Sequence, residues 1–287
     1  MNVALNTSID KGTGRDTVVT RTRVRLYDPV LMRFTTIDPL AEKYYPTSPY
    51  AYCQNDPMSY IDLNGEEPTK AEAAAMAAHV YGDKSASVLI GGWRISHANL
   101  GVTSNDLNGK YGLKSCIYER VDRCGQVQEY AYVTAGTEDV IDCVHDALQT
   151  KGLSLQYKQS VENAEKISSL CKKELTFIGH SLGGGEAALN AMATGRKAIT
   201  FNAAGVSNFT KAANAKISSI FKNFKSLIKA YIMTTDPLNA LQNSPSLIGR
   251  YLPDVDGQRI YVNPTTKKGI LNGHSIDNFL DAFGVNY

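Results

Sequence analysis

Residue types that together perform nucleophilic catalysis occur in the second half of the chain. Ser181 lies in the stretch GHSLGG at 179–184, which contains a GxSxG motif. The apolar stretch 175–178 precedes this motif and small residues follow it, as a strand–turn–helix nucleophile elbow requires. So sharp a turn strains the serine backbone and leaves no room for neighbouring side chains. The pattern predicts that Ser181 is an activated nucleophile and that the Leu182 N–H faces an oxyanion.

The general base follows by elimination, because the order in such folds is serine, acid, histidine. Three of the five histidines precede Ser181, and His180 is its neighbour, which should point away from the reacting hydroxyl. His274, in the loop NGHSIDNF, is the histidine that remains downstream. We predict that His274 takes the serine proton. The alternative is a solvated loop histidine.

The acid must lie between these two residues. Glu186 follows the nucleophile by about one helical turn and is badly placed, which leaves three aspartates: Asp236, Asp254 and Asp256. Asp236 directly follows the apolar stretch LIKAYIM, and the carboxyl ends of parallel strands are where such sheets place their chemistry. We predict that Asp236 orients the histidine. The alternative is a helix N-cap before Pro237.

A second oxyanion element is expected just past a strand predicted to end near residue 134. The residues there are Ala135, Gly136 and Thr137. At a junction between a strand and a helix the backbone N–H groups are free to donate. We predict oxyanion donors at Gly136 and Thr137, and Thr137 is equally consistent with an N-cap.

A mainly parallel α/β sheet is needed to position these residues, and the hydrophobic pattern predicts one. Apolar stretches that fit strands alternate with longer stretches that fit helices. The expected strands lie at 115–120, 129–136, 175–178, 198–201, 227–233 and 259–262. The expected helices lie at 69–82, 138–149, 157–171, 183–194 and 276–283.

The motifs together resemble the class 3 lipase group of α/β-hydrolases. GHSLGG at 179–184, TAGT at 134–137, DPLN at 236–239 and the late His274 fall in that family's order. The resemblance covers roughly residues 70–285 and implies an α/β-hydrolase sheet with flanking helices. It also implies hydrolysis of lipid esters, most often acylglycerols or phospholipids, without a metal or an organic cofactor.

The first part of the chain has a different character, and we place a domain boundary between residues 66 and 69. Residues 1–66 are rich in Tyr, Pro, Asp and Asn, which favours short strands and tight turns. Residues 67–287 form the second predicted domain. Part of the first domain resembles the Rhs repeat-associated core. The matching residues are Tyr27 to Pro29, Arg33, Phe34, Asp38, Pro39, Ser48 to Tyr50, Asn55, Pro57 and Asp62 to Gly65.

That second resemblance implies the remnant of a β-shell followed by a variable C-terminal toxin, with a cognate immunity protein as partner. In the Rhs family autoproteolysis can release the toxin. Asp38 and Asp62 are the candidate pair of carboxylates for such a cleavage, and two turn residues are the alternative. The chain reads as a short β- and turn-rich core remnant joined to a lipase-like effector.

A basic segment that could meet a lipid surface lies between Ala187 and Thr235, which contains no Asp or Glu. Apolar residues at helical spacing run through it with lysines at their flanks. The candidate membrane-facing residues are Lys216, Ile220, Phe221, Lys222, Phe224 and Lys225. The alternative is a surface helix that buries its apolar stripe on the sheet.

Composition excludes several function classes. The 287 residues are 43% hydrophobic and 20% charged, which is typical of a globular chain rather than a disordered one. The net charge of +2 gives no support for a nucleic-acid partner. No apolar run reaches the roughly 18 residues of a membrane span, and we expect no signal peptide. We expect synthesis in the cytoplasm followed by export or injection.

The sequence therefore predicts a serine lipase, phospholipase A-like, that acts as the C-terminal effector module of an Rhs-type polymorphic toxin. Its substrate is a lipid or phospholipid, with transient contact to a membrane surface. One alternative is a thioesterase, an acyltransferase or a general esterase on the same triad. The other is a non-catalytic binding module associated with Rhs proteins.

Overall fold

The computed structural model divides into two compact units, Met1–Thr69 and Lys70–Tyr287. In the second unit and the two residues before it, the structure describes residues 68–82, 89–109, 111–121, 125–136, 150–214, 224–244, 252–265 and 273–285. In the first unit it describes four short strands. The predicted helix at 138–149 and the predicted residues Asp38, Asp62 and Thr137 lie outside the described residues.

The strands of the first unit form an antiparallel sheet in the order β1-β2-β3-β4. Their bounds are β1 Thr7–Ile9, β2 Val18–Arg21, β3 Leu26–Asp28 and β4 Arg33–Phe34. Strands of two to four residues agree with the short strands that the turn-forming residues predict.

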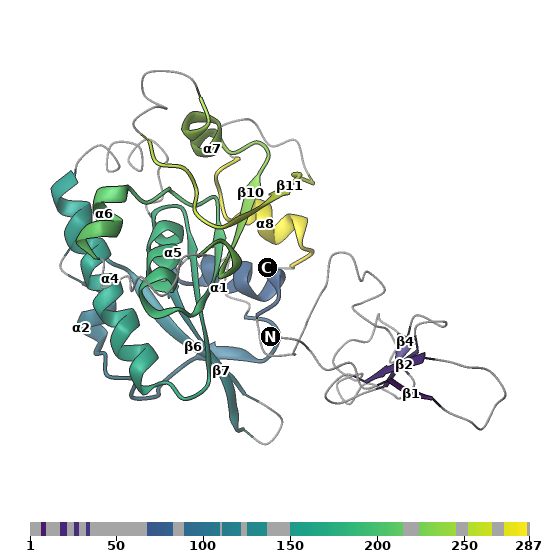
Figure 1. Ribbon diagram of the computed structural model, residues 1–287. Coiled ribbons are helices and arrows are strands. Elements are labelled where there is room, and N and C mark those ends of the chain that lie inside the picture. Colours follow the sequence, from purple (N-terminus) through teal and green to yellow (C-terminus); the bar gives the residue numbers. More distant parts are fainter. Residues whose placement is uncertain are drawn as a thin grey trace. The chain divides into compact units, whose positions relative to one another are not determined.

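The second unit is built on a seven-stranded mixed sheet in the order β11-β10-β9-β8-β7-β6-β5 (Figure 1). Strands β7 to β11 pair in parallel, and β6 and β5 add to the β7 edge in antiparallel fashion. The bounds are β5 Trp93–Ile95, β6 Ser115–Val121, β7 Val127–Thr134, β8 Glu174–His180, β9 Lys197–Phe201, β10 Ile228–Met233 and β11 Gln258–Val262. The predicted mainly parallel α/β sheet with flanking helices is confirmed.

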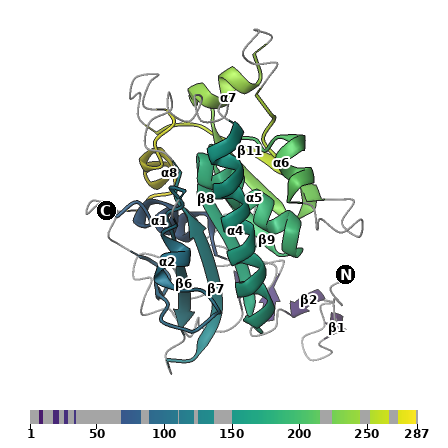
Figure 2. The same cartoon turned by 90° about the vertical axis from the view of Figure 1, so that its left-hand side faces the viewer.

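Helices cover both faces of this sheet. The helices are α1 Lys70–His79, α2 Ser104–Leu107, α4 Thr150–Leu170, α5 Leu182–Thr194, α6 Asn208–Ala213, α7 Pro237–Gln242 and α8 Asp277–Ala282, with a 3₁₀ turn, η4, at Phe224–Ser226. Helices α4 and α5 pack on one face and α1 and α8 on the other (Figure 2). Helix α4 begins at Thr150, earlier than the predicted 157.

Alternate residues of the central strand β8 serve the two cores. Leu175 and Phe177 pack in the core beneath α4 and α5, and Ile178 packs in the core beneath α1 and α8. This is the period of two that a strand covered on both faces requires. It also directs His180, at the carboxyl end of β8, toward the face that carries α1 and α8.

The predicted membrane-facing stripe falls largely outside the described residues, which include Phe224 and Lys225 of it. Phe224 is half-buried and packs against the hydrophobic core beneath α5. This contact agrees at Phe224 with the alternative of a stripe that packs on the sheet, and the membrane-facing role of the segment stays a prediction. Lys225 is exposed. Among the helices of the described part, none combines the length and the apolar character of a membrane span.

Candidate active site

The turn between β8 and α5 has the strained geometry that the GxSxG motif predicts. Ser181 has φ 57° and ψ −125°, a conformation that costs a residue with a side chain roughly 1–3 kcal/mol. A Cβ at Gly179 would collide with the Gly183 carbonyl, and one at Gly183 would collide with the Thr134 carbonyl. The two glycines are therefore required by close backbone contacts, and they allow the chain to reverse from strand to helix at Ser181.

The end of strand β7 lies directly over this turn. Thr134 Oγ1 donates to the Gly183 carbonyl at 2.7 Å. A Cβ built on Gly136 would lie 2.7 Å from Ser181 Cβ and 2.8 Å from the Leu182 nitrogen. The chain after β7 is thus held against the nucleophile and the first N–H of α5, where the motif places an oxyanion hole.

The two predicted oxyanion segments differ in how their N–H groups are used. Leu182 is the first residue of α5, so its N–H has no partner within the helix, and the helix dipole favours negative charge there. The Gly136 N–H, by contrast, donates to the Tyr81 hydroxyl at 2.9 Å. This differs from the expectation that the N–H groups of this segment are free. Gly136 still frames the space beside Ser181.

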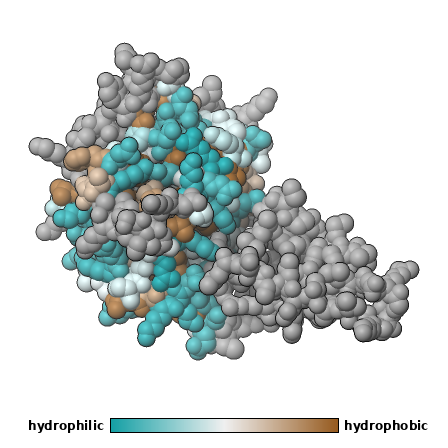
Figure 3. All heavy atoms as spheres, viewed as in Figure 1, coloured by the Kyte–Doolittle hydropathy of each residue, from teal (hydrophilic) through white to brown (hydrophobic). Residues whose placement is uncertain are grey.

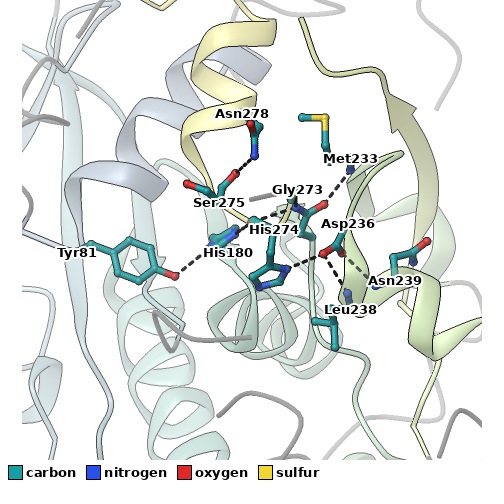
Figure 4. Close-up of polar contacts among 11 residues, drawn as sticks. Tyr81, His180, Met233, Asp236, Leu238, Asn239, Gly273, His274, Ser275 and Asn278 are labelled. Atoms are coloured by element: carbon teal, nitrogen blue, oxygen red, sulfur yellow. Dashed lines mark hydrogen bonds and ion pairs between the residues drawn. The ribbon is translucent and has the colours of Figure 1, made fainter. Parts of the chain in front are cut away.

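Asp236 and His274 meet as the order of residues predicts (Figure 4). The carboxylate lies 2.8 Å from His274 Nδ1, and both residues are 3% exposed. Asp236 also caps helix α7 by accepting the N–H groups of Leu238 and Asn239 at 3.2 Å and 3.1 Å. The N-cap of α7 is therefore confirmed, and it is compatible with the predicted role of Asp236 in orienting His274. Three donors converge on one carboxylate, which holds it in place.

The other ring nitrogen of His274 is left for a proton transfer. Nε2 is buried and has no hydrogen-bond partner among the described residues. The loop of His274 is attached to the elbow, because the ring of His180 bonds to the His274 carbonyl at 2.7 Å. Ser181 itself is fully buried and donates its N–H to the Phe201 carbonyl at 3.0 Å. The predicted nucleophile, base and acid come from three loops at the carboxyl edge of the sheet.

The remaining acid candidates have other partners. Asp254 lies 3.4 Å from the Arg259 guanidinium. Asp256 pairs with Lys211 at 2.6 Å. Glu186 is fully buried within α5, and burial raises its pKa well above the ordinary value. The structure brings Asp236, and none of these three, to the imidazole of His274.

Two residues that sequence reasoning did not select are linked to the loop of His274, Asn202 directly and Tyr81 through His180. Tyr81, just after α1, bonds through its hydroxyl to His180 Nδ1 at 2.7 Å. Asn202, just after β9, has φ 41° and donates to the His274 carbonyl at 3.1 Å. An asparagine directly after an apolar strand is a signal for a left-handed turn, whereas Tyr81 leaves no local signal because its contacts are remote in sequence.

Comparison with known proteins identifies a family. The family described as Phospholipase-like, Tle-like phospholipase domain, matches residues 72–275. This range includes Ser181, Asp236 and His274.

Two individual proteins share parts of the chain. The extracellular phospholipase A1 of Serratia liquefaciens is 36% identical over 166 residues, which cover 55% of this chain and 51% of that protein. The chain therefore aligns with about half the length of that relative. The crystal structure of extracellular lipase LipA from Serratia marcescens aligns with a TM-score of 0.35 and 13% identity, covering 64% of this chain and 42% of that chain.

Proposed function

The chain belongs to the family of Tle-like phospholipase domains, and from this premise we propose that it is a serine phospholipase of the A type, built on an α/β-hydrolase sheet. Family membership agrees with the predicted enzyme class, a lipid ester hydrolase. The observation that carries the proposal is the buried pair of Asp236 and His274, in which Nε2 has no partner among the described residues, together with the strained backbone of the GxSxG serine. This arrangement activates a hydroxyl for acyl transfer.

The reaction proceeds through an acyl-enzyme. Ser181 Oγ attacks the carbonyl carbon of an acyl ester while its proton passes to His274 Nε2. Asp236 holds the imidazole by Nδ1 and stabilises the imidazolium. The Leu182 N–H, together with the predicted donor at Thr137, stabilises the oxyanion of the tetrahedral intermediate. The lysolipid alkoxide leaves with the proton from His274, and a water molecule then releases the fatty acid by the same steps.

The substrate class follows from the relatives. A phospholipase A1 cleaves the acyl ester at the sn-1 position of a phospholipid, and the Serratia liquefaciens relative carries that name. We extend this to the chain as part of the proposal.

A panel of acyl substrates tests this function against its alternatives. The full chain is offered vesicles of phosphatidylethanolamine and phosphatidylglycerol, a neutral acylglycerol and an acyl thioester, and products are read by mass spectrometry. Fatty acid and lysophospholipid from the vesicles support a phospholipase. Turnover of the thioester or of the acylglycerol alone favours the thioesterase or general esterase reading. A protein that neither turns over a substrate nor reacts with a fluorophosphonate probe is the non-catalytic binding module.

The proposal includes a role for residues 1–66 as a remnant of an Rhs repeat-associated core, with residues 67–287 as the effector of a polymorphic toxin. The motifs from Tyr27 to Gly65 and the antiparallel sheet of short strands support this reading. Cleavage after the motif Asp62–Gly65, with Asp38 and Asp62 as the carboxylate pair, would give a fragment that begins near Glu66. A wild type of full-length mass, or a fragment that persists in Asp62→Asn, contradicts this autoprocessing. A toxin of this type has an immunity protein, which co-purification from the producing cell would identify.

Contact with a lipid surface is the last part of the proposal. The segment with Lys216, Lys222 and Lys225 is basic, and such segments bind anionic membranes. Described residues on the face seen in Figure 3 are largely hydrophilic with scattered hydrophobic ones. The large apolar side chains that are exposed in the described part include Phe209 at 73%. Charge reversal of the three lysines should abolish binding to phosphatidylglycerol vesicles, and unchanged binding contradicts this part of the proposal.

A further inference from the structure

A chain of hydrogen bonds joins the loops that carry the proposed catalytic groups, and it runs through two residues that the mechanism does not use. Its members are the Gly136 N–H, the Tyr81 hydroxyl, the His180 ring and the His274 carbonyl. Figure 4 shows the last three. We infer that Tyr81 and His180 are positioning residues. They hold the segment at Gly136 (the oxyanion loop) and the segment at Gly273 and His274 (the base loop) in place relative to Ser181. The inference rests on the proposed function, since it concerns the same site.

The direction of each bond in this chain is fixed by its two ends. The Gly136 N–H can only donate, so the Tyr81 oxygen, 2.9 Å away, accepts. The Tyr81 hydroxyl then gives its own hydrogen to His180 Nδ1 at 2.7 Å. At the other end the His274 carbonyl can only accept, so His180 Nε2 carries a proton and donates at 2.7 Å. A single tautomer of His180 satisfies both of its bonds.

Burial keeps the His180 ring in the neutral form that these bonds use. The side chain is 4% exposed, and its ring centroid lies 4.9 Å from that of His274. Desolvation, and then the neighbouring imidazole, lower the pKa of His180 to about 3. A neutral imidazole has one donor and one acceptor. Both are engaged here, so His180 connects two loops and takes no part in proton transfer.

The carbonyl of His274 is held from a second side. Asn202 Nδ2 donates to the carbonyl oxygens of Gly273 and His274, each at 3.1 Å. Asn202 directly follows Phe201, whose carbonyl accepts the Ser181 N–H. The His274 carbonyl therefore accepts hydrogen bonds from two sides. One donor is His180, which precedes the nucleophile, and the other is Asn202, which follows strand β9.

This arrangement sets the position of the base. The bond from Asp236 orients the ring of His274 through Nδ1, but the ring can reach the nucleophile only if its backbone lies at the right distance. The same chain continues to Gly136, which lies against Ser181 and Leu182. A displacement of about 1 Å in such a site costs on the order of 100-fold in rate. Loss of the chain should therefore reduce turnover more than substrate binding.

The test compares two tyrosine hydroxyls in the full chain. Tyr81→Phe removes the shared hydroxyl and keeps the ring, which packs edge-on against His180 with centroids 5.8 Å apart. Tyr118→Phe is the matched control, because it also removes a tyrosine–histidine bond, to His79 Nδ1 at 2.9 Å, without a link to the catalytic loops. The readouts are the rate of fluorophosphonate labelling of Ser181, and kcat and KM on phosphatidylethanolamine vesicles.

We expect Tyr81→Phe to lower both kcat and the labelling rate by about 10–100-fold, with KM changed by less than about threefold. Tyr118→Phe should leave kcat and the labelling rate within about twofold of the wild type. His180→Gln keeps an amide donor for the His274 carbonyl but loses the Tyr81 bond. Tyr81→Phe and His180→Gln remove the same bond. The double variant should therefore have a kcat no lower than that of the less active single variant.

Two results overturn the inference: equal rates for Tyr81→Phe and Tyr118→Phe, or losses that multiply in the double variant with His180→Gln. A wild type that is labelled at Ser181 but cleaves no lipid contradicts the proposed function, while the labelling rates still decide the inference. A wild type without labelling at Ser181 contradicts both.

Discussion

Asp236 can perform two tasks with one carboxylate, and the second can be removed without the first. It accepts two backbone N–H groups at the start of α7 and lies 2.8 Å from His274 Nδ1. The cap needs an oxygen, which an asparagine side chain also supplies. The histidine needs a negative charge to fix its tautomer and stabilise the imidazolium. A change from Asp to Asn therefore keeps the first task and loses the second.

We predict that Asp236→Asn lowers kcat by about 10²–10⁴-fold while the melting temperature stays close to that of the wild type. Asp236→Ala should lose similar activity and in addition about 1 kcal/mol of stability, because the cap is lost. Thermal unfolding and turnover of both variants check this. A variant Asp236→Asn with activity near the wild type would show that another residue supplies the charge.

Much of this site could be predicted because its residues carry local signals. Ser181 lies in a motif that encodes its own turn, and Asp236 and His274 follow from their order along the chain and from a strand end. Tyr81 and Asn202 could not be found in this way, because their roles depend on contacts across the fold, 99 residues apart between Tyr81 and His180. The use of the Gly136 N–H by Tyr81 is likewise a tertiary property.

Among the elements, the contact between the end of β7 and the start of α5 determines the shape of the site. Gly183 lies against the Thr134 carbonyl, and Thr134 Oγ1 bonds to the Gly183 carbonyl. Any side chain at 183 must push these elements apart, since the neighbouring atoms are backbone. The same movement would displace Gly136 from Ser181.

We predict that Gly183→Ala lowers kcat by at least about 100-fold, the usual effect of a displacement near 1 Å in an active site, and lowers the melting temperature. Gly284→Ala is the control, because Gly284 has φ 67° but no atom within 4 Å of an added Cβ. It should cost only the left-handed strain of about 1–2 kcal/mol. Equal activity in the two variants would contradict the role of the β7–α5 contact.

Helices and strands were predicted correctly where the hydrophobic pattern was long and clear. The prediction failed for elements that are short or that contain a residue unfavourable to them. The buried strands β8, β9 and β10 were identified from their apolar residues. Strand β5, with three residues at the sheet edge, is too short to show alternation. Gly152 lies within α4, although glycine has a low helix propensity. The predicted start of this helix, residue 157, was therefore too late.

On the scale of the whole molecule, two buried groups should shape the dependence of stability on pH. The pKa of His180 falls to about 3 in the folded protein from an ordinary value of 6.5, mainly through desolvation. The unfolded chain then binds more protons between these values, so stability decreases as pH falls from 6.5 toward 3. Glu186 acts in the opposite direction, because burial raises its pKa well above 4.5 and the Gln156 amide opposes this only in part.

We predict that Glu186→Gln stabilises the protein, and increasingly so as pH rises above 4.5. In that range the unfolded chain ionises Glu186 and the folded protein does not, at a cost to stability of up to about 1.4 kcal/mol per pH unit. Glu162→Gln is the control, because Glu162 is exposed on α4 and its ion pair with Lys158, at 3.9 Å, lies at the surface. This change should alter stability by less than about 1 kcal/mol. Urea denaturation at pH 5, 7 and 9 measures both. A gain that is the same at every pH would contradict the raised pKa.

The measurement that tests the central claim most directly is the hydrolysis of a phosphatidylethanolamine with a different acyl chain at each position. The full chain is compared with Ser181→Ala and with Ser169→Ala, a serine whose hydroxyl bonds to the Lys166 carbonyl on α4. We predict that the wild type and Ser169→Ala release the sn-1 fatty acid with an equal amount of lysophospholipid, and that Ser181→Ala releases neither. Equal product from Ser181→Ala, or no product from the wild type, would contradict a serine phospholipase.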